Sequence, residues 1–162
     1  MVRIFVENLG MRNSGLIKGM WFDLPVSFQT IAEKIGLNEQ YEEYIITDYE
    51  APFPIGEFDS IDKLNQMTEE LDELPTYIEA YVKQLIEEYY GSFEELLNDW
   101  ENIIFVEGVT NDKLYGQYII DEGYFNVPSE LEFYIDYESL GRDWRINGNI
   151  LYVDDGMFII VG

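Results

Sequence analysis

The sequence contains neither cysteine nor histidine in its 162 residues. Without cysteine the chain has no disulfide, no thiolate nucleophile and no ordinary structural zinc site. Without histidine it lacks the commonest general base, the Ser-His-Asp triad and imidazole metal ligands. The enzymatic chemistry that remains is that of carboxylates, either with oxygen-binding cations or as a glycosidase-type pair of acids. Nothing in the sequence singles out two acids for that role, so we expect no enzyme, no cofactor and no metal.

Basic residues are also scarce. Only 9 Lys and Arg stand against 33 Asp and Glu, which gives a formal net charge of −24. Neutralising the phosphates of nucleic acid requires the cations that this chain lacks, so nucleic acid is not an expected partner. The apolar content of 47%, with 16% aromatic residues, is sufficient for a core, whereas disordered acidic tails are poor in aromatic residues. The composition therefore predicts a folded, acidic protein.

Long hydrophobic runs are missing as well. No apolar stretch approaches the roughly 18 to 20 residues that span a bilayer. The first residues, Met1 to Glu7, are interrupted by charge too early for a signal peptide. We therefore expect a cytoplasmic protein that does not bind membranes.

The acidic residues are concentrated in the middle of the chain. Residues 1–34 hold 4 basic and 3 acidic groups, residues 35–112 hold 2 and 21, and residues 113–162 hold 3 and 9. The net charges of these three segments are +1, −19 and −6. Blocks of like charge are often disordered, but here apolar residues recur through them at regular spacing. We expect a folded framework that carries the acids.

The first 60 residues predict a small α+β domain. Alternating apolar residues indicate three strands, at residues 2–7, 20–24 and 44–49. A helix is predicted between the second and third strands, because Ser27 is a typical N-cap and Gly36 a typical left-handed residue at a helix end. Its apolar face contains Phe28, Ile31 and Ile35.

The next segment, residues 61–102, predicts a helical domain. Apolar residues at helical spacing indicate three helices, at about residues 61–74, 78–89 and 93–100. Pro75 and Gly91 separate these helices, and Ser92 with Glu95 has the Ser-x-x-Glu form of a capping box.

The last segment, residues 103–162, predicts a second α+β domain. Its elements are a strand at residues 103–106, a helix around residues 114–119 closed by Gly123, a helix from Pro128 to near Gly141, and a β-hairpin over residues 149–161. The hairpin is predicted because the Asp155-Gly156 step supplies left-handed turn residues between two β-branched runs. The fold class is therefore α+β, in the order α+β, helical, α+β.

The middle helices carry like charges on one face. Glu69 and Glu73 lie four residues apart, as do Glu95 and Asp99, and each such pair destabilises a helix by a few tenths of a kcal/mol. One interpretation is a surface selected for solubility or high salt. The other is that a partner requires the negative charge.

The second interpretation compares the acids with duplex DNA, which carries one negative charge per ~1.7 Å of axis. At that density the net charge would correspond to about 41 Å, roughly 12 base pairs, and in a dimer to roughly 24. A protein of this kind would compete with DNA for the basic groove of a DNA-binding enzyme. Its effect would be competitive inhibition.

Several stretches near the two ends of the chain carry a family resemblance. They are Glu7 to Gly10 with Asn13, Gly15 and Gly19, then Trp21 to Pro25, Ile35 to Asn38, Tyr41 to Tyr44, Asp48 to Glu50, Tyr134 to Tyr137 and Gly141 to Asp143. Together they resemble the ArdA family of antirestriction proteins. The likeness covers nearly the whole chain and is looser in the middle, where mainly acidity and helicity match.

The resemblance implies a function and an architecture. Members of the family are DNA mimics, carried by conjugative elements and phages, that inhibit type I restriction-modification enzymes by occupying the DNA site of the methyltransferase core. They are elongated three-domain chains that form homodimers through the C-terminal domain, which implies domains at residues 1–60, 61–102 and 103–162 here. The alternative function is an acidic binding or regulatory module for another basic DNA-binding protein.

The candidate site residues fall into two groups. We expect the phosphate-like surface to be formed by acids of the first two domains: Glu39, Glu42, Glu43, Asp48, Glu50, Glu57, Asp59, Glu69, Glu70, Asp72, Glu73, Glu87, Glu88, Glu94 and Glu95. The family's antirestriction motif maps to about residues 126–141, including Asn126, Leu131, Tyr134, Ile135, Asp136, Tyr137 and Gly141. In the family this motif lies by the dimer contact, so its role here is either packing or function. We expect Arg3, Arg12 and Lys18 to form ion pairs within the chain.

Overall fold

The computed structural model describes residues 1–161, and the chain divides into two compact units, Met1–Phe93 and Glu94–Gly162. We call them the N-terminal and C-terminal units. Each contains one antiparallel three-stranded sheet together with helices, so the predicted α+β class is confirmed. The division into three domains stays a prediction. Within the described part of the chain, no helix is both long and apolar enough to cross a bilayer.

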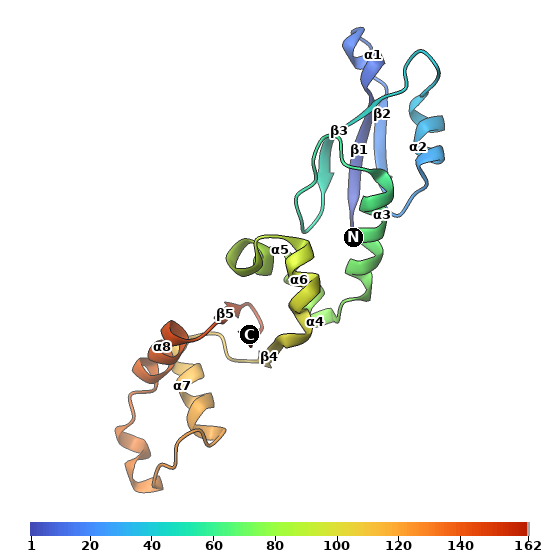
Figure 1. The fold of residues 1–162 in the computed structure, drawn as a ribbon. Coiled ribbons are helices and arrows are strands. Elements are labelled where there is room, and N and C mark those ends of the chain that lie inside the picture. The colour runs from blue at the N-terminus through green and yellow to red at the C-terminus, as the bar shows by residue number, and fades with distance from the viewer. Residues whose placement is uncertain (162) are drawn as a thin grey trace. The chain divides into compact units, whose positions relative to one another are not determined.

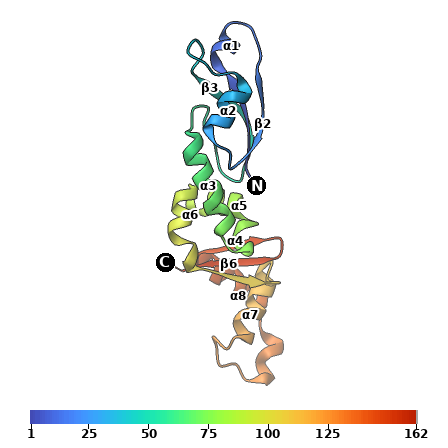
Figure 2. The same cartoon turned by 90° about the vertical axis from the view of Figure 1, so that its right-hand side faces the viewer.

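The N-terminal unit begins with a sheet of strand order β2-β1-β3. Its strands are β1 (Arg3–Asn8), β2 (Gly19–Asp23) and β3 (Tyr44–Glu50), close to the predicted ranges. Figure 2 shows α2 (Phe28–Ile35) lying against this sheet. The core forms here because Ile4 of β1 and both Ile31 and Ile35 of α2 are fully buried.

Both predicted ends of α2 are confirmed. The Ser27 hydroxyl oxygen accepts a hydrogen bond from the Thr30 backbone N–H at 3.2 Å. At the other end Gly36 adopts φ 73°, the left-handed conformation in which a side chain would be strained.

A short helix after β1, α1 (Leu9–Asn13), was not predicted, because the glycines and asparagines of this segment favour a loop. Asn8 makes it possible. Its side-chain oxygen accepts from the Met11 backbone N–H at 3.0 Å, and its amide nitrogen donates to the carbonyls of Ile35 and Gly36 at 3.1 and 3.2 Å. Through these bonds Asn8 caps α1 and joins it to the end of α2. Its side chain is completely buried.

The rest of the N-terminal unit is helical (Figure 1). It contains α3 (Ile61–Glu73), α4 (Thr76–Glu79), α5 (Val82–Leu85) and the π-helical turn η1 (Ile86–Tyr90). The helix predicted over residues 61–74 is confirmed. The single helix predicted over residues 78–89 is wrong, because Tyr81 has φ −125° and ψ 19° and interrupts the helical backbone. The π turn closes where the Gly91 N–H donates to the Ile86 carbonyl at 2.8 Å.

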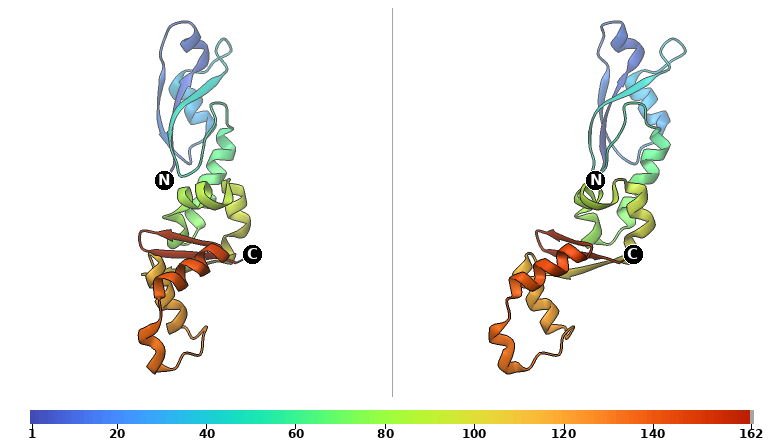
Figure 3. Two further views of the ribbon diagram at one scale, coloured as in Figure 1. Left: turned by 90° about the vertical axis from the view of Figure 1, so that its left-hand side faces the viewer. Right: turned by 60° about the vertical axis from the view of Figure 1, so that its left-hand side comes forward.

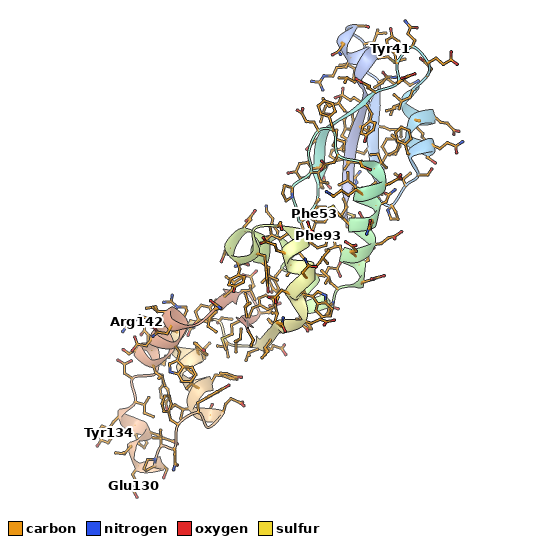
Figure 4. All side chains as sticks on the ribbon, in the orientation of Figure 1. Tyr41, Phe53, Phe93, Glu130, Tyr134 and Arg142 are labelled. Carbon is orange, nitrogen blue, oxygen red and sulfur yellow. The ribbon has the colours of Figure 1, made fainter. Side chains whose placement is uncertain are left out.

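Aromatic stacking joins the segment after β3 to the last helical residue of this unit. The rings of Phe53 and Phe93 are stacked with centroids 4.8 Å apart and an interplanar angle of 22°, and Figure 4 labels both. Both side chains are buried. Residues 51–60 form a long irregular connection, and this aromatic pair holds the connection against the first residue of α6 (Phe93–Asp99).

The C-terminal unit contains a second sheet, of strand order β4-β6-β5. Its elements are α6 (Phe93–Asp99) from its second residue onward, the 3₁₀ turn η2 (Trp100–Asn102), β4 (Ile103–Glu107), α7 (Asp112–Asp121), the 3₁₀ segment η3 (Ser129–Tyr134), α8 (Tyr137–Asn147), β5 (Ile150–Val153) and β6 (Gly156–Ile160). Figure 3 shows α7 and α8 on one side of the sheet. The core between them contains Tyr115, Ile119 and Met157.

Two predictions in this unit need correction. The helix predicted from Pro128 to Gly141 is instead η3 followed by a separate helix, α8, because the Asp136 carboxylate accepts from the Ser139 N–H at 3.1 Å and starts a new helix. The hairpin is confirmed, but the reason given for it is wrong. Its turn residues are Asp154 and Asp155, neither has positive φ, and Gly156 is the first residue of β6.

Candidate partner-binding surface

A loop between α2 and β3 presents three of the predicted acids. Glu39, Glu42 and Glu43 are exposed in it, and the backbone around them is held by hydrogen bonds. The side-chain oxygen of Asn38 accepts from the N–H groups of residues 40 and 41 at 2.8 and 2.9 Å, and the Glu43 carbonyl accepts from Leu9 N–H at 2.9 Å. The carboxylates themselves are therefore not needed to fix the loop. We call residues 38–43 the acidic loop.

The acidic loop packs against α1 through Tyr41 (Figure 4). The ring of Tyr41 occupies the space where a Cβ atom on Gly10 would stand, so only glycine permits this contact. A hollow of about 300 Å³ lies between α1 and the loop, lined by Leu9, Asn13 and the loop residues themselves. The contact with α1 fixes the position of the three carboxylates within the N-terminal unit.

The next predicted acids lie on β3 and in residues 51–60. Asp48, Glu50 and Glu57 are exposed, and Asp59 is partly buried. Asp59 serves the local structure, because its carboxylate accepts from the Gly56 N–H at 2.8 Å. Glu50 lies 3.4 Å from Arg3, so its charge is partly offset.

The four predicted acids of α3 lie near its C-terminal end, on its solvent side. Glu69, Asp72 and Glu73 are exposed, Glu70 is partly buried, and the buried face is formed by other residues such as Leu71. From position 69 to position 73 the helix rises about 6 Å, over which B-form DNA would carry between 3 and 4 charges at ~1.7 Å each. The linear charge density of this segment thus matches that of duplex DNA.

The end of α3 places these acids where a helix least favours them. The last turn has Asp72 and Glu73 and no basic residue, so their charges face the negative end of the helix dipole. Glu69 and Glu73 also repel each other at a spacing of four residues. The charge is therefore present at a cost in helix stability.

The remaining predicted acids lie around η1 and α6. Glu87 and Glu88 are exposed in η1, with Glu87 4.0 Å from Lys83 and Glu88 accepting from Gln84 at 3.3 Å. Glu94 and Glu95 are exposed in the first turn of α6, where the helix dipole favours negative charge. Among residues 1–161, no three carboxylates lie close enough together to hold a metal ion.

The basic residues near the N-terminus are largely used within the chain. Arg3 donates to Asp23 at 2.7 Å and lies 5.0 Å above the ring of Trp21. Arg12 lies 2.8 Å from the nearly buried carboxylate of Glu7. The predicted internal pairing is confirmed for these two arginines. The Lys18 side chain packs against Gly36, and its pairing stays a prediction.

The predicted antirestriction motif, residues 126–141, contains two kinds of residue. Asn126, Leu131 and Tyr134 are exposed, and Ile135 is partly buried. Figure 4 shows Tyr134 in the η3 segment, at the end of the C-terminal unit away from its sheet. This segment exposes two adjacent large aromatic side chains, because Tyr134 is 84% exposed and Phe133, which was not predicted, is 95% exposed.

The other motif residues hold the fold. Asp136 caps α8 and also accepts from the Ser139 hydroxyl at 2.7 Å, which lowers the pKa of its carboxyl group. Tyr137 is the first residue of α8, and its backbone carbonyl lies against Gly116 of α7. Gly141 lies inside α8, not at a helix end as predicted, and is buried against α7.

A polar contact that the sequence did not indicate joins α7, α8 and β5. Arg145 donates two hydrogen bonds to Asp112, at 2.8 and 3.1 Å, and the Tyr152 hydroxyl donates to the same carboxylate at 2.7 Å. The bonds from Arg145 lower the pKa of Asp112, and burial together with this carboxylate raises the pKa of Tyr152. Asp112 lies 33 positions before Arg145 and 40 positions before Tyr152 in the sequence. No local motif could therefore indicate this contact.

Comparison with known proteins identifies the family. A family model described as antirestriction protein (ArdA) matches residues 4–159, which is nearly the whole chain. No curated protein matches the sequence. The matched range includes the acidic loop, α3 and residues 126–141. The chain therefore belongs to the ArdA antirestriction protein family.

Proposed function

We propose that this protein inhibits type I restriction-modification enzymes as a DNA mimic that occupies the DNA groove of their methyltransferase core. Membership of an antirestriction family gives the general function. The observation that carries the specific mechanism is the group of four carboxylates near the end of α3, three exposed and one partly buried, whose number per length of helix axis is comparable with the charge density of duplex DNA.

Composition supports a negative surface that the protein itself cannot neutralise. Nine Lys and Arg cannot offset 33 Asp and Glu, whichever pairs they form. The N-terminal unit has 18 acidic and 6 basic residues, so its net charge is −12. The α3 acids retain this charge although it destabilises the helix, which favours a role in binding over a role in stability.

The mechanism requires no bond to form or break. Acidic side chains would replace DNA phosphates against the Lys and Arg of the enzyme, and both surfaces would release counterions on binding. Affinity would then fall steeply as the salt concentration rises. Because many carboxylates share the contact, each should contribute modestly.

We also propose that the functional form is a homodimer joined through the C-terminal unit. Its η3 segment exposes Leu131, Phe133 and Tyr134, and adjacent exposed aromatic residues of this kind are typical of interfaces. A two-fold dimer would cover this segment in both copies. It would also double the number of negative charges available to the enzyme.

The direct test is competition. Purified protein is titrated into a complex of a type I methyltransferase with a labelled cognate duplex, at several salt concentrations, and the released duplex is measured. The proposal predicts stoichiometric displacement, without turnover, that weakens as salt rises. Binding to the enzyme without displacement would support the alternative of an acidic regulatory module. Absence of any binding would leave only a solubility role for the acids.

A further inference from the structure

One stretch of the N-terminal unit differs in charge from the acidic loop that packs beside it. From Asn8 to Phe22 the chain contains no Asp or Glu, although 33 of its 162 residues are acidic. The connection between α1 and β2, residues 14–18, lies in this stretch, and Figure 1 shows it at the end of the sheet away from Met1. We call residues 14–18 the α1–β2 tip. Its two aliphatic side chains point to solvent, with Leu16 59% and Ile17 83% exposed.

Backbone hydrogen bonds define the conformation of the α1–β2 tip. The Gly15 N–H donates to the Arg12 carbonyl at 3.1 Å, and the Leu16 N–H donates to the Met11 carbonyl at 2.9 Å. Gly15 has φ 86°, so this is the Schellman arrangement that ends a helix on a left-handed glycine. At the other end of the loop, the Asn8 N–H donates to the Lys18 carbonyl at 2.8 Å. The two aliphatic side chains are thus presented from an ordered turn, which reduces the entropy lost on binding.

The charge of the α1–β2 tip does not suit a phosphate-binding groove. Arg12 is paired with the nearly buried Glu7, so the remaining cation of this stretch is the exposed residue Lys18, whose ammonium group lies near Gly36 at the end of α2. A groove that binds phosphates is itself rich in Lys and Arg, and it would repel Lys18. The favourable counterpart is a surface that is apolar and carries negative charge.

We propose that Leu16 and Ile17 dock into an apolar pocket bordered by carboxylates on the target enzyme, outside the part of its groove that binds phosphates. This inference rests on the proposed function. The acids provide attraction that any DNA-binding groove shares, because all such grooves bind phosphates. The α1–β2 tip provides a contact that differs between enzymes, so it determines which enzymes are inhibited most strongly.

The experiment compares full-length variants in the duplex-displacement assay across a range of salt. The double variant Leu16→Ser/Ile17→Ser should bind about tenfold more weakly, because two aliphatic side chains lose their pocket, while the slope of log affinity against log salt stays unchanged. Lys18→Glu should also weaken binding. This sign is diagnostic, because an added anion on a surface that contacted phosphate-binding residues would strengthen binding instead. Ile146→Ser removes another exposed aliphatic side chain, 65% exposed and outside the proposed acidic surface, and is the matched control with unchanged affinity.

The outcomes separate this inference from the proposed function. Wild-type protein that fails to displace DNA overturns both. Wild-type displacement with tip variants of equal affinity overturns the docking contact alone, as does stronger binding by Lys18→Glu. A change in oligomeric state of the double variant, measured by sedimentation, would assign the α1–β2 tip to contact between copies and also overturn it. Thermal melts of every variant establish that the fold is intact, as expected for such exposed positions.

Discussion

A Cβ atom on Gly141 would lie 2.8 Å from the backbone nitrogen of Gly116, on the facing helix. It would also overlap the backbone carbonyl oxygen of Asp112. The two helices α7 and α8 therefore meet backbone to backbone at a pair of glycines. The predicted antirestriction motif ends at this crossing, so Gly141, its last residue, is required for packing.

We expect Gly141→Ala to destabilise the C-terminal unit by about 2 to 3 kcal/mol, because the added methyl group can be accommodated only if the helices separate. Chemical denaturation followed by circular dichroism measures the change. Asp143→Ala, at an exposed position of the same helix, is the control and should change stability by no more than about 0.5 kcal/mol. Equal stability of the two variants would contradict the close crossing.

Neutralising the α3 acids should affect stability and inhibition in opposite directions. Glu69→Gln/Glu73→Gln removes a repulsive pair and an acid from the negative end of the helix, so it should raise stability by a few tenths of a kcal/mol. The same variant should inhibit several-fold more weakly, because two phosphate-like charges are lost. Glu33→Gln/Glu122→Gln has the same net charge and lies outside the proposed surface. If both double variants inhibit equally, total charge and not its position determines binding.

Salt should stabilise the fold while it weakens inhibition. With a net charge of −24, repulsion among exposed carboxylates opposes the compact state, and ions screen that repulsion. Raising sodium chloride from about 10 mM to 0.5 M, where the Debye length falls from about 30 Å to a few Å, should increase the melting temperature by several degrees. Differential scanning calorimetry measures it. A melting temperature that is independent of salt would mean that the charges are too far apart to repel each other.

The contact between Asp112 and Arg145 predicts a pH dependence. The folded pKa of Asp112 lies below its ordinary value of 3.8, so its contribution to stability is complete above that pH and is lost as the pH falls through the folded pKa. Asp112→Asn should therefore be less stable than wild type by about 1 kcal/mol at pH 7, a figure that allows for the partial exposure of Arg145.

Melts of both proteins between pH 7 and pH 2.5 test this sign. The gap between them should stay constant down to about pH 5 and close below pH 4, because protonated Asp112 resembles Asn. Asp121→Asn, at an exposed position, is the control. A gap that widens in acid would mean that Asp112 is not stabilised in its charged form.

The aromatic residues of η3 provide the test of the proposed dimer. Phe133→Ser/Tyr134→Ser should shift the protein from dimer to monomer in analytical ultracentrifugation, because two side chains that would be buried between copies are removed. Their exposures of 95% and 84% mean that the fold of one chain does not need them. The melting temperature at high dilution should accordingly be unchanged. A dimer of wild-type affinity would place the interface elsewhere.

Local signals in the sequence predicted much of the fold. Alternating apolar residues predicted strands of the first sheet, and β-branched runs predicted the strands of the second. Ser27 and Gly36 predicted both ends of α2, because caps and periodicity depend on neighbouring residues. The helix predictions failed where one side chain or one backbone conformation determines where a helix begins or ends. Asn8 starts α1 from the end of a strand, and Tyr81 interrupts an apolar pattern that is otherwise helical.

The candidate surface was predictable in composition but not in detail. Of the predicted acids, only Asp59 and Glu70 are partly buried, because charged residues in a chain with few cations stay in water. What the sequence could not indicate is which residues meet across long separations. Asp112, Arg145 and Tyr152 are one example, and the Gly116 and Gly141 crossing is another. Phe133 was not predicted as a site residue. The only sequence signal for it was its position next to Tyr134, which was predicted.

The acidic loop divides two tasks between different residues. Asn38 and the backbone of Glu43 hold its shape, Tyr41 seats it on α1, and the side chains of Glu39 and Glu42 are exposed. Substitutions at these carboxylates therefore leave the scaffold untouched. An engineer can exchange Glu for Asp, Gln or Lys there, one position at a time, and vary the strength of the proposed binding without redesigning the backbone.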